Sequence, residues 1–177
     1  MKEGKLILEL KSKRVAIATL FGVVVFVSKT IVPSPLDKMF VIVQALLLAL
    51  GALLLGRLGA TYVAGVGGVL TALWRIAFAP FSLGSAILYG LFVDGFFLAL
   101  GVNTTGGKVK TGRLIAAMTV STALIGFICY YMSYSFGLVP RNAVLEVVIL
   151  VVGTLSGALG GYLASVFWER HLKNAEL

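Results

Sequence analysis

The sequence predicts an all-α membrane protein, a bundle of six transmembrane helices with both termini in the cytoplasm. Hydrophobic residues make up 59% of its 177 residues and charged residues only 12%, about half the charged share of a soluble domain. Six apolar stretches approach the roughly 20 residues that a helix needs to cross the hydrocarbon core of a bilayer. Most Lys and Arg residues lie between these stretches. Lipid is therefore the expected solvent of most of this chain.

The six predicted spans are joined by short connections. Lipid offers backbone groups no hydrogen-bond partner, so each segment must satisfy its own and is expected to be helical. Runs such as Ala45–Leu50 do not alternate polar and apolar residues, which argues against a β-barrel. The predicted spans cover residues 14–31, 39–55, 58–78, 83–102, 114–138 and 143–168. With residues 1–13 as a charged cytoplasmic tail, they form a single transmembrane domain over 1–177.

The connections carry turn-forming residues. Pro33-Ser34-Pro35 predicts an extended outer loop, because proline fixes φ and removes a backbone donor. Residues 56–59 predict a tight cytoplasmic turn, and residues 79–82 a short outer turn in which Ser82 caps the next helix. Residues 103–113 form a polar, Gly-rich, basic stretch that is expected to be a cytoplasmic loop.

The distribution of positive charge predicts the orientation. With the N-terminus in the cytoplasm, 11 of the 15 Lys and Arg residues fall on the cytoplasmic side. The other four, on the outer side, are Lys29, Lys38, Arg75 and Arg141. This asymmetry follows the positive-inside rule. The net charge of +8 is therefore interpreted as a signal of topology and of contact with the lipid bilayer, and no nucleic-acid partner is expected.

A few polar residues interrupt the apolar spans and are candidates for a binding site. A charged side chain near a helix centre costs about 2.5–3.5 kcal/mol on insertion scales, so it usually faces a cavity or a partner. One interpretation is that Arg75 pairs with a carboxylate and tethers helices. The other is a pocket in the outer half of the bundle for a small, flat, partly polar molecule, where aromatic faces stack and a few groups form hydrogen bonds. The predicted lining residues are Gln44, Trp74, Arg75, Tyr89, Asp94, Tyr130, Tyr134, Asn142 and Glu146.

Small residues recur at helical spacing on three spans. In lipid, helices associate by close packing, so small residues four apart mark contact faces. Such faces either pack within the bundle or dock another membrane protein, and the spacing alone leaves both interpretations open. The repeats are Ala18 with Gly22, then Ala60, Ala64, Gly68 and Ala72, and then Gly153, Gly157, Gly161 and Ser165.

Catalytic chemistry is not expected. The only histidine, His171, lies in the C-terminal segment, so no Ser–His pair can form within the spans. No His, Cys, Asp or Glu residues have the spacing of metal ligands. Residues 104–108 are Gly-rich but lack the spacing of a phosphate-binding loop. No catalytic residue, metal site or cofactor is therefore predicted.

Three short motifs resemble the substrate-binding S components of energy-coupling factor (ECF) vitamin transporters. Ala18-x-x-x-Gly22 resembles that family's Ala-x-x-x-Ala docking motif, with Gly in place of the second Ala. Leu55–Ala60 resembles the Gly-x-x-Gly-Ala turn between the second and third spans of several members. Gly84–Asp94 is similar to the fourth span of the branch that handles thiamine or its hydroxymethylpyrimidine precursor. The chain lacks the N-terminal histidine of the cobalt and nickel branch.

The resemblance implies a mechanism. The chain would capture a vitamin or vitamin precursor from outside, with thiamine or hydroxymethylpyrimidine favoured. It would then dock on a transmembrane coupling protein driven by two cytoplasmic ATPases, through Ala18 and Gly22 together with Gly157 and Gly161. Three alternatives stay open at this point: a membrane scaffold or assembly subunit without a pocket, a stand-alone carrier, and a membrane enzyme.

Overall fold

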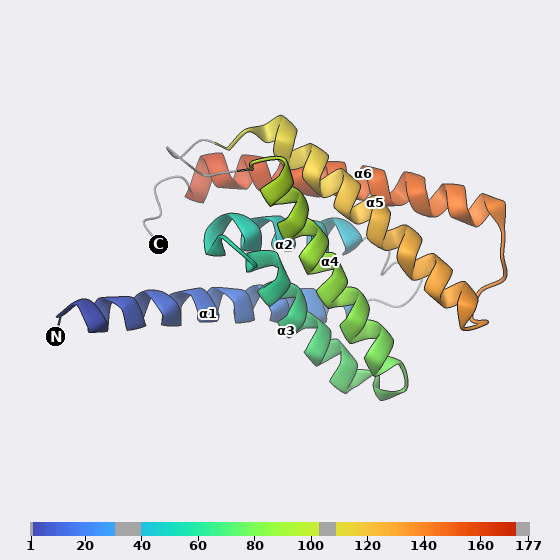
Figure 1. The fold of residues 1–177 in the computed structure, drawn as a ribbon, viewed down its shortest axis with the longest axis horizontal. Helices are drawn as coiled ribbons and strands as arrows, with labels where there is room; N and C mark the ends of the chain where they lie inside the picture. Colours follow the sequence, from blue (N-terminus) through green and yellow to red (C-terminus); the bar gives the residue numbers. More distant parts are fainter. Residues whose placement is uncertain (1, 31–39, 103–108, 173–177) are drawn as a thin grey trace.

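The computed structural model describes residues 2–30, 40–102 and 109–172, and this part of the chain is an all-α bundle (Figure 1). Its six α-helices are joined by turns, with one 3₁₀ turn at Ile76–Phe78 and one π-helical turn at Trp168–Leu172. The helices are α1 (Lys2–Thr30), α2 (Val41–Leu55), α3 (Gly59–Trp74), α4 (Ala79–Ala99), α5 (Thr111–Ser135) and α6 (Ala143–Phe167). The prediction of an all-α protein is confirmed for the described residues.

Three helical segments are long and apolar enough to cross a bilayer: Ile76–Ala99, Thr111–Ser135 and Ala143–Leu172. Val15–Thr30, Val41–Leu55 and Gly59–Trp74 are apolar but shorter. A helix of 16 residues rises only about 24 Å, less than the roughly 30 Å of hydrocarbon. The protein is therefore a membrane protein by the length and composition of its helices.

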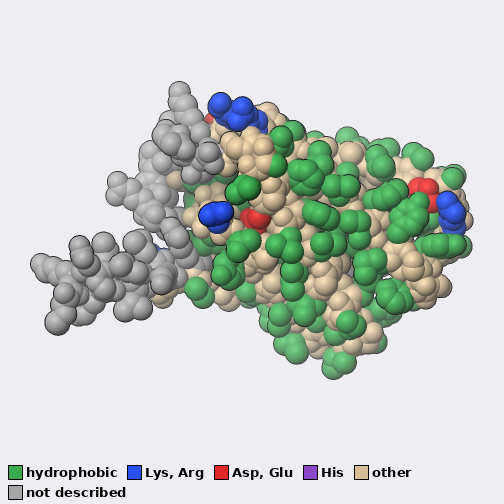
Figure 2. All heavy atoms as spheres, in the orientation of Figure 1, with side chains coloured by type: hydrophobic (Ala, Val, Ile, Leu, Met, Phe, Trp, Pro, Cys, Tyr) green, Lys and Arg blue, Asp and Glu red, His purple; other side chains and the backbone are tan. Residues whose placement is uncertain are grey.

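The central helix of the bundle is α2. It contacts all five other helices, whereas α5 and α6 pack along each other, α3 packs on α4, and α1 packs mainly on α3. Figure 1 shows this arrangement, with the N-terminal part of α1 projecting beyond the other helices. Figure 2 shows hydrophobic side chains over the middle of one face and most charged side chains toward its two ends. This distribution suits a molecule whose middle lies in lipid.

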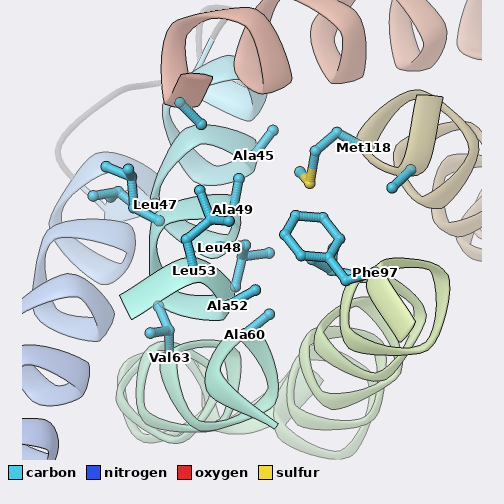
Figure 3. Close-up of a cluster of buried hydrophobic side chains, with 14 of the residues drawn as sticks. Ala45, Leu47, Leu48, Ala49, Ala52, Leu53, Ala60, Val63, Phe97 and Met118 are labelled. Carbon is cyan, nitrogen blue, oxygen red and sulfur yellow. The ribbon is translucent and has the colours of Figure 1, made fainter. Parts of the chain in front are cut away.

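The core forms around α2 and consists mainly of apolar side chains, several of which Figure 3 shows. Ala45, Leu48 and Ala49 of α2 are fully buried. They lie between α3 and the two side chains Phe97 of α4 and Met118 of α5, which are also buried. A helix that is hydrophobic all round is stable only when neighbours cover it on all sides, which explains the central position of α2.

Two helix boundaries differ from the sequence prediction. The outer turn expected at 79–82 is wrong: α4 already begins at Ala79, and Ser82 lies inside the helix rather than capping it. Pro80 sits in the first turn of α4, where its missing N–H costs nothing because that group has no intrahelical partner. The span expected over 58–78 ends at Trp74, because Arg75 has non-helical backbone angles (φ −119°, ψ 70°).

The remaining boundaries agree more closely with the prediction. The tight turn before α3 is present, with Gly56 at φ 73° and Leu58 at φ 66°. The described part of the predicted tail is helical and continuous with α1, which begins at Lys2. The Pro33-Ser34-Pro35 segment and residues 103–108 of the predicted Gly-rich loop lie outside the described residues.

The glycines of the small-residue repeats are in close contact with neighbouring helices. A Cβ atom at Gly22 would lie 2.6 Å from the Val66 side chain of α3. At Gly157 it would lie 2.6 Å from the Met118 carbonyl oxygen of α5, and at Gly161 it would lie 3.0 Å from the Ile115 Cα atom. Glycine therefore sets how closely α1 approaches α3 and how closely α6 approaches α5.

Candidate functional site

A cavity of about 480 Å³ lies at one end of the bundle, where α1 and α5 end and α2, α4 and α6 begin. Residues from five helices line it, so it exists only in the assembled bundle. The lining residues are Lys29, Val41, Gln44, Phe81, Ser85, Ala86, Tyr89, Thr122, Ile125, Gly126, Cys129, Tyr130, Ser133, Val139, Leu145, Val148, Ile149, Val152 and Gly153. Most of this wall is apolar, and its polar groups come mainly from α2, α4 and α5.

Two polar groups of the cavity wall join α4 to α5. The Tyr89 hydroxyl and the Thr122 Oγ1 atom are 2.8 Å apart, and both side chains are buried. Thr122 donates its only hydroxyl hydrogen to the Met118 carbonyl oxygen. Tyr89 must therefore be the donor to Thr122, because a hydroxyl has a single hydrogen to give. This hydrogen bond holds the two helices in register at the cavity.

Gln44 is the polar residue of the wall whose hydrogen-bonding capacity is unused. Its side chain is 9% exposed and lies on the first half of α2. Within the described residues its amide forms no hydrogen bond, although it carries two donor hydrogens and an acceptor oxygen. The amide atoms are accessible from the cavity, since they are not among the fully buried polar atoms without a partner. A molecule in the cavity could therefore form hydrogen bonds with both ends of the amide.

Tyr130 lines the cavity and also fixes the turn between α5 and α6. Its hydroxyl accepts a hydrogen bond from the Asn142 backbone N–H at 2.9 Å. The Asn142 side chain in turn accepts from the Val144 N–H at 2.9 Å and so caps α6. Asn142 is therefore an N-cap outside the cavity wall, a common role for asparagine because its oxygen satisfies an unpaired helix donor.

Glu146 lies in the first turn of α6, outside the cavity wall. Its carboxylate is 3.8 Å from the Arg141 Nε atom and accepts a hydrogen bond from the Tyr131 hydroxyl at 3.5 Å. One of the two interpretations paired Arg75 with a carboxylate, and such a pair is found here for Arg141 instead. Arg75 itself is exposed, and no ion pair between it and a carboxylate occurs within the described residues.

Trp74 and Tyr134 are at the surface rather than in the cavity. Trp74 is 67% exposed and contacts Phe26 of α1 edge to face, with ring centroids 6.4 Å apart. Tyr134 is 41% exposed, although Tyr130 one turn earlier is buried. Aromatic side chains at helix ends are typical of a lipid interface, and this role suits both residues.

Asp94 lies at the opposite end of the bundle from the cavity and has a structural role. Its carboxylate accepts hydrogen bonds from the backbone N–H groups of Ala60 (3.1 Å) and Thr61 (2.8 Å), and from the Thr61 hydroxyl (2.6 Å). These N–H groups belong to the first turn of α3, whose own cap residue Leu58 supplies no side-chain acceptor. A carboxylate from α4 thus caps α3, at the wall of an open hollow of about 730 Å³ that Arg57 also lines.

The structure therefore brings together three of the nine predicted pocket residues, Gln44, Tyr89 and Tyr130. The other six lie outside this cavity wall for the reasons above. Five further polar or reactive residues line the cavity and were not predicted: Lys29, Ser85, Thr122, Cys129 and Ser133. The last three share one face of α5 at helical spacing, and this pattern is the signal that could have identified them.

The four predicted docking residues face neighbouring helices of the same chain. Ala18 is 6% exposed, and Gly22, Gly157 and Gly161 are buried against α3 or α5. The small-residue repeats were expected either to pack within the bundle or to dock another protein. The contacts of these four residues are of the first kind.

The described residues contain no group of three or more His, Cys, Asp or Glu side chains that could hold a metal ion. No protein-family model, curated protein or solved structure matches the chain. A function is therefore inferred from the chemistry of the cavity itself.

Proposed function

We propose that this protein is a membrane-embedded substrate-binding subunit that captures a small, partly polar molecule in the 480 Å³ cavity. The observation that carries the proposal is the Gln44 amide, which opens onto the cavity and has no hydrogen-bond partner among the described residues. An amide that faces a cavity with its donors and acceptor unused is available to bind a ligand there.

The size and wall of the cavity support this function. Small-molecule sites usually measure about 300–1,000 Å³ and are mainly apolar, with a few placed polar groups. Here Ile125, Val148 and Ile149 supply apolar surface, while Gln44 and Tyr89 supply hydrogen-bonding groups. This combination suits a flat heterocycle with polar atoms on its edge.

We further propose that the chain crosses the membrane six times, with both termini in the cytoplasm. The cavity then opens toward the outside, since Lys29 at the end of α1 and Val41 at the start of α2 both line it. The more basic end of the molecule lies in the cytoplasm, as the positive-inside rule requires.

The motifs at Ala18–Gly22, Leu55–Ala60 and Gly84–Asp94 extend the proposal to an S component of an ECF-type importer. Its ligand would be a vitamin or vitamin precursor, with thiamine and hydroxymethylpyrimidine as the first candidates. Transport would require a transmembrane coupling protein and two cytoplasmic ATPases. Because Gly22 packs against α3, a coupling protein could reach the Ala18–Gly22 face only if α1 separates from α3.

Two competing functions are less well supported. A scaffold or assembly subunit would need no cavity lined by an unpaired amide. A stand-alone carrier would need polar groups between the cavity and the opposite end of the bundle, and the side chains there, including Leu48, Phe97 and Met118, are buried and apolar (Figure 3).

The proposal is tested by mass spectrometry of small molecules that copurify with the protein, followed by calorimetric titration with thiamine and hydroxymethylpyrimidine. We expect at least one heterocycle to be retained. Protein that retains no small molecule and binds neither compound would contradict the proposed function.

Gln44→Leu is expected to weaken binding of the retained compound by about tenfold or more, since each lost hydrogen bond to a buried amide is worth about 1–3 kcal/mol. The thermal stability of the empty protein should not fall, because the amide has no partner within the described residues to lose. Trp74→Ala is the control, because Trp74 is exposed and outside the cavity wall. Equal affinities for wild type and Gln44→Leu would exclude Gln44 from the site.

A further inference from the structure

We propose that the cavity selects its ligand by the hydrogen bonds that the ligand can donate. It favours flat molecules whose edge carries several N–H or O–H groups over molecules of similar shape that can only accept. This inference rests on the proposed function and specifies the substrate class of the same site. Its basis is that four hydroxyl groups of the cavity wall already donate their hydrogens to other groups of the protein.

Two of these hydroxyls belong to serines that bond to the backbone of their own helices. Ser133 donates to the Cys129 carbonyl oxygen at 2.8 Å, and Ser85 donates to the Ser82 carbonyl oxygen at 3.2 Å. Serine in a helix commonly forms this bond, because a carbonyl of the preceding turn is within reach. A hydroxyl has one hydrogen and two acceptor lone pairs. Each serine therefore keeps acceptor capacity at the cavity wall.

The other two hydroxyls form a chain of hydrogen bonds with a fixed direction. Tyr89 donates to Thr122, and Thr122 donates to the Met118 carbonyl oxygen, both at 2.8 Å. The chain ends on a carbonyl, which can only accept, so neither hydroxyl has a hydrogen left for a ligand. Within the described residues, the Tyr89 hydroxyl accepts no hydrogen bond. Its oxygen is thus a further acceptor at the wall.

These acceptors discriminate between ligands. A ligand N–H or O–H group placed against one of them gains a hydrogen bond, and no bond of the protein is lost. A ligand acceptor at the same place meets a lone pair, unless the hydroxyl leaves its present partner, and then one bond replaces another. The surrounding wall includes Ile125, Val148 and Ile149, and mismatched polar groups are costly in such apolar surroundings.

Gln44 completes the description of the ligand class. Its amide has two donor hydrogens and one acceptor oxygen, all unused within the described residues. It can therefore pair with one ligand acceptor and one further ligand donor. The expected ligand is a flat ring system with amino or hydroxyl groups on its edge and an acceptor atom beside one of them.

The test uses Cys129, which lines the same cavity and is the only cysteine of the 177-residue chain. Two disulfide fragments share one short linker, but one ends in resorcinol and the other in its dimethyl ether, which has no donor. The Cys129 thiolate attacks the linker sulfur, a new disulfide forms, and mercaptoethanol leaves. Intact-protein mass spectrometry at exchange equilibrium gives the two capture constants. Each is divided by that of a small free thiol in the same detergent.

We expect the normalised ratio of resorcinol to dimethyl ether capture to be about ten in the wild type. Thr122→Val should lower the ratio several-fold, because the Tyr89 hydrogen loses its acceptor and becomes available to the dimethyl ether. Ser133→Ala removes one acceptor without breaking a contact between helices, so it should also lower the ratio and gives the comparison if Thr122→Val does not fold.

The matched control is Thr119→Val. The Thr119 hydroxyl donates to the Ile115 carbonyl oxygen in the same way, but Thr119 lies outside the cavity wall. This variant should keep the wild-type ratio, so it separates an effect in the cavity from a general loss of threonine hydroxyls in α5. Cys129→Ser should capture neither fragment, which identifies Cys129 as the site of capture.

A wild-type ratio near one, or a ratio that both Thr122→Val and Ser133→Ala leave unchanged, would overturn donor selection. A retained compound without any N–H or O–H group would contradict donor selection alone. Protein that captures the fragments in the expected ratio but retains no small molecule would contradict the proposed function alone. A Cys129 that captures neither fragment would contradict both, because the cavity would then not admit a flat ring.

Discussion

Replacing Asp94 by alanine is expected to destabilise the protein by about 2–4 kcal/mol. The substitution removes the acceptor of three hydrogen bonds, from the Ala60 N–H, the Thr61 N–H and the Thr61 hydroxyl. Hydrogen bonds to a charged group are worth about 1.5–3 kcal/mol each, and loss of a helix cap alone costs up to about 2 kcal/mol. Thermal unfolding of the purified protein in detergent, followed by intrinsic fluorescence, measures the loss.

Two further variants define the origin of this effect. Glu169→Ala removes an exposed carboxylate from the π-helical turn and should change stability by less than about 0.5 kcal/mol. Asp94→Asn keeps one acceptor oxygen and should fall between Asp94→Ala and the wild type. The folded fraction of Asp94→Ala should bind ligand with unchanged affinity, because Asp94 is outside the cavity wall. Normal stability combined with lost binding would instead place Asp94 in the ligand site.

Gly157→Ala is expected to destabilise the protein by about 1–3 kcal/mol, the usual cost of overpacking a tight contact. The added Cβ atom would lie 2.6 Å from the Met118 carbonyl oxygen and 2.8 Å from the Thr119 Cα atom. Both are backbone atoms of α5, so a side-chain rotation cannot relieve the clash and the helices must separate. Thermal unfolding under the same conditions measures this cost.

The matched control is Gly95→Ala. Gly95 is also a glycine inside a helix, but nothing lies within 4 Å of a Cβ atom placed there. Alanine should stabilise this position by up to about 1 kcal/mol, because glycine is the poorer helix former. Equal effects of the two substitutions would contradict the tight contact between α5 and α6. Unchanged stability of Gly157→Ala with loss of a partner protein would restore the docking interpretation of that repeat.

Much of the architecture could be predicted because it depends on local properties of the sequence. Hydrophobic runs in a medium without hydrogen-bond partners must be helical, so the six helical segments were found by reading along the chain. Gly56 and Leu58 have positive φ angles in the tight turn that the Gly-Arg-Leu-Gly sequence indicated. The predicted helix boundaries were wrong where one residue type suits two local structures. Pro80 predicts a turn, but proline is equally suited to the first turn of a helix, which is where it lies.

The candidate site could be predicted only in part. Gln44, Tyr89 and Tyr130 stand out because polar or aromatic side chains are unusual within apolar spans, and all three line the cavity. Asp94 stands out for the same reason but serves as the cap of a neighbouring helix. The free-energy cost of placing a polar side chain in lipid shows that such a residue needs a partner. The identity of that partner depends on how the helices are rotated and which of their ends meet.

The amino-acid sequence by itself determined that this protein is a membrane-embedded helical bundle and which residues in it are costly to place in lipid, because both follow from composition and order along the chain. The tertiary structure alone decided that Gly22 and Gly157 set the helix spacing, that Asp94 caps α3, and that Lys29 and Gln44 meet at one cavity. Those pairings join residues that are distant in sequence, and they arise only when close packing fixes the rotation and depth of each helix against its neighbours.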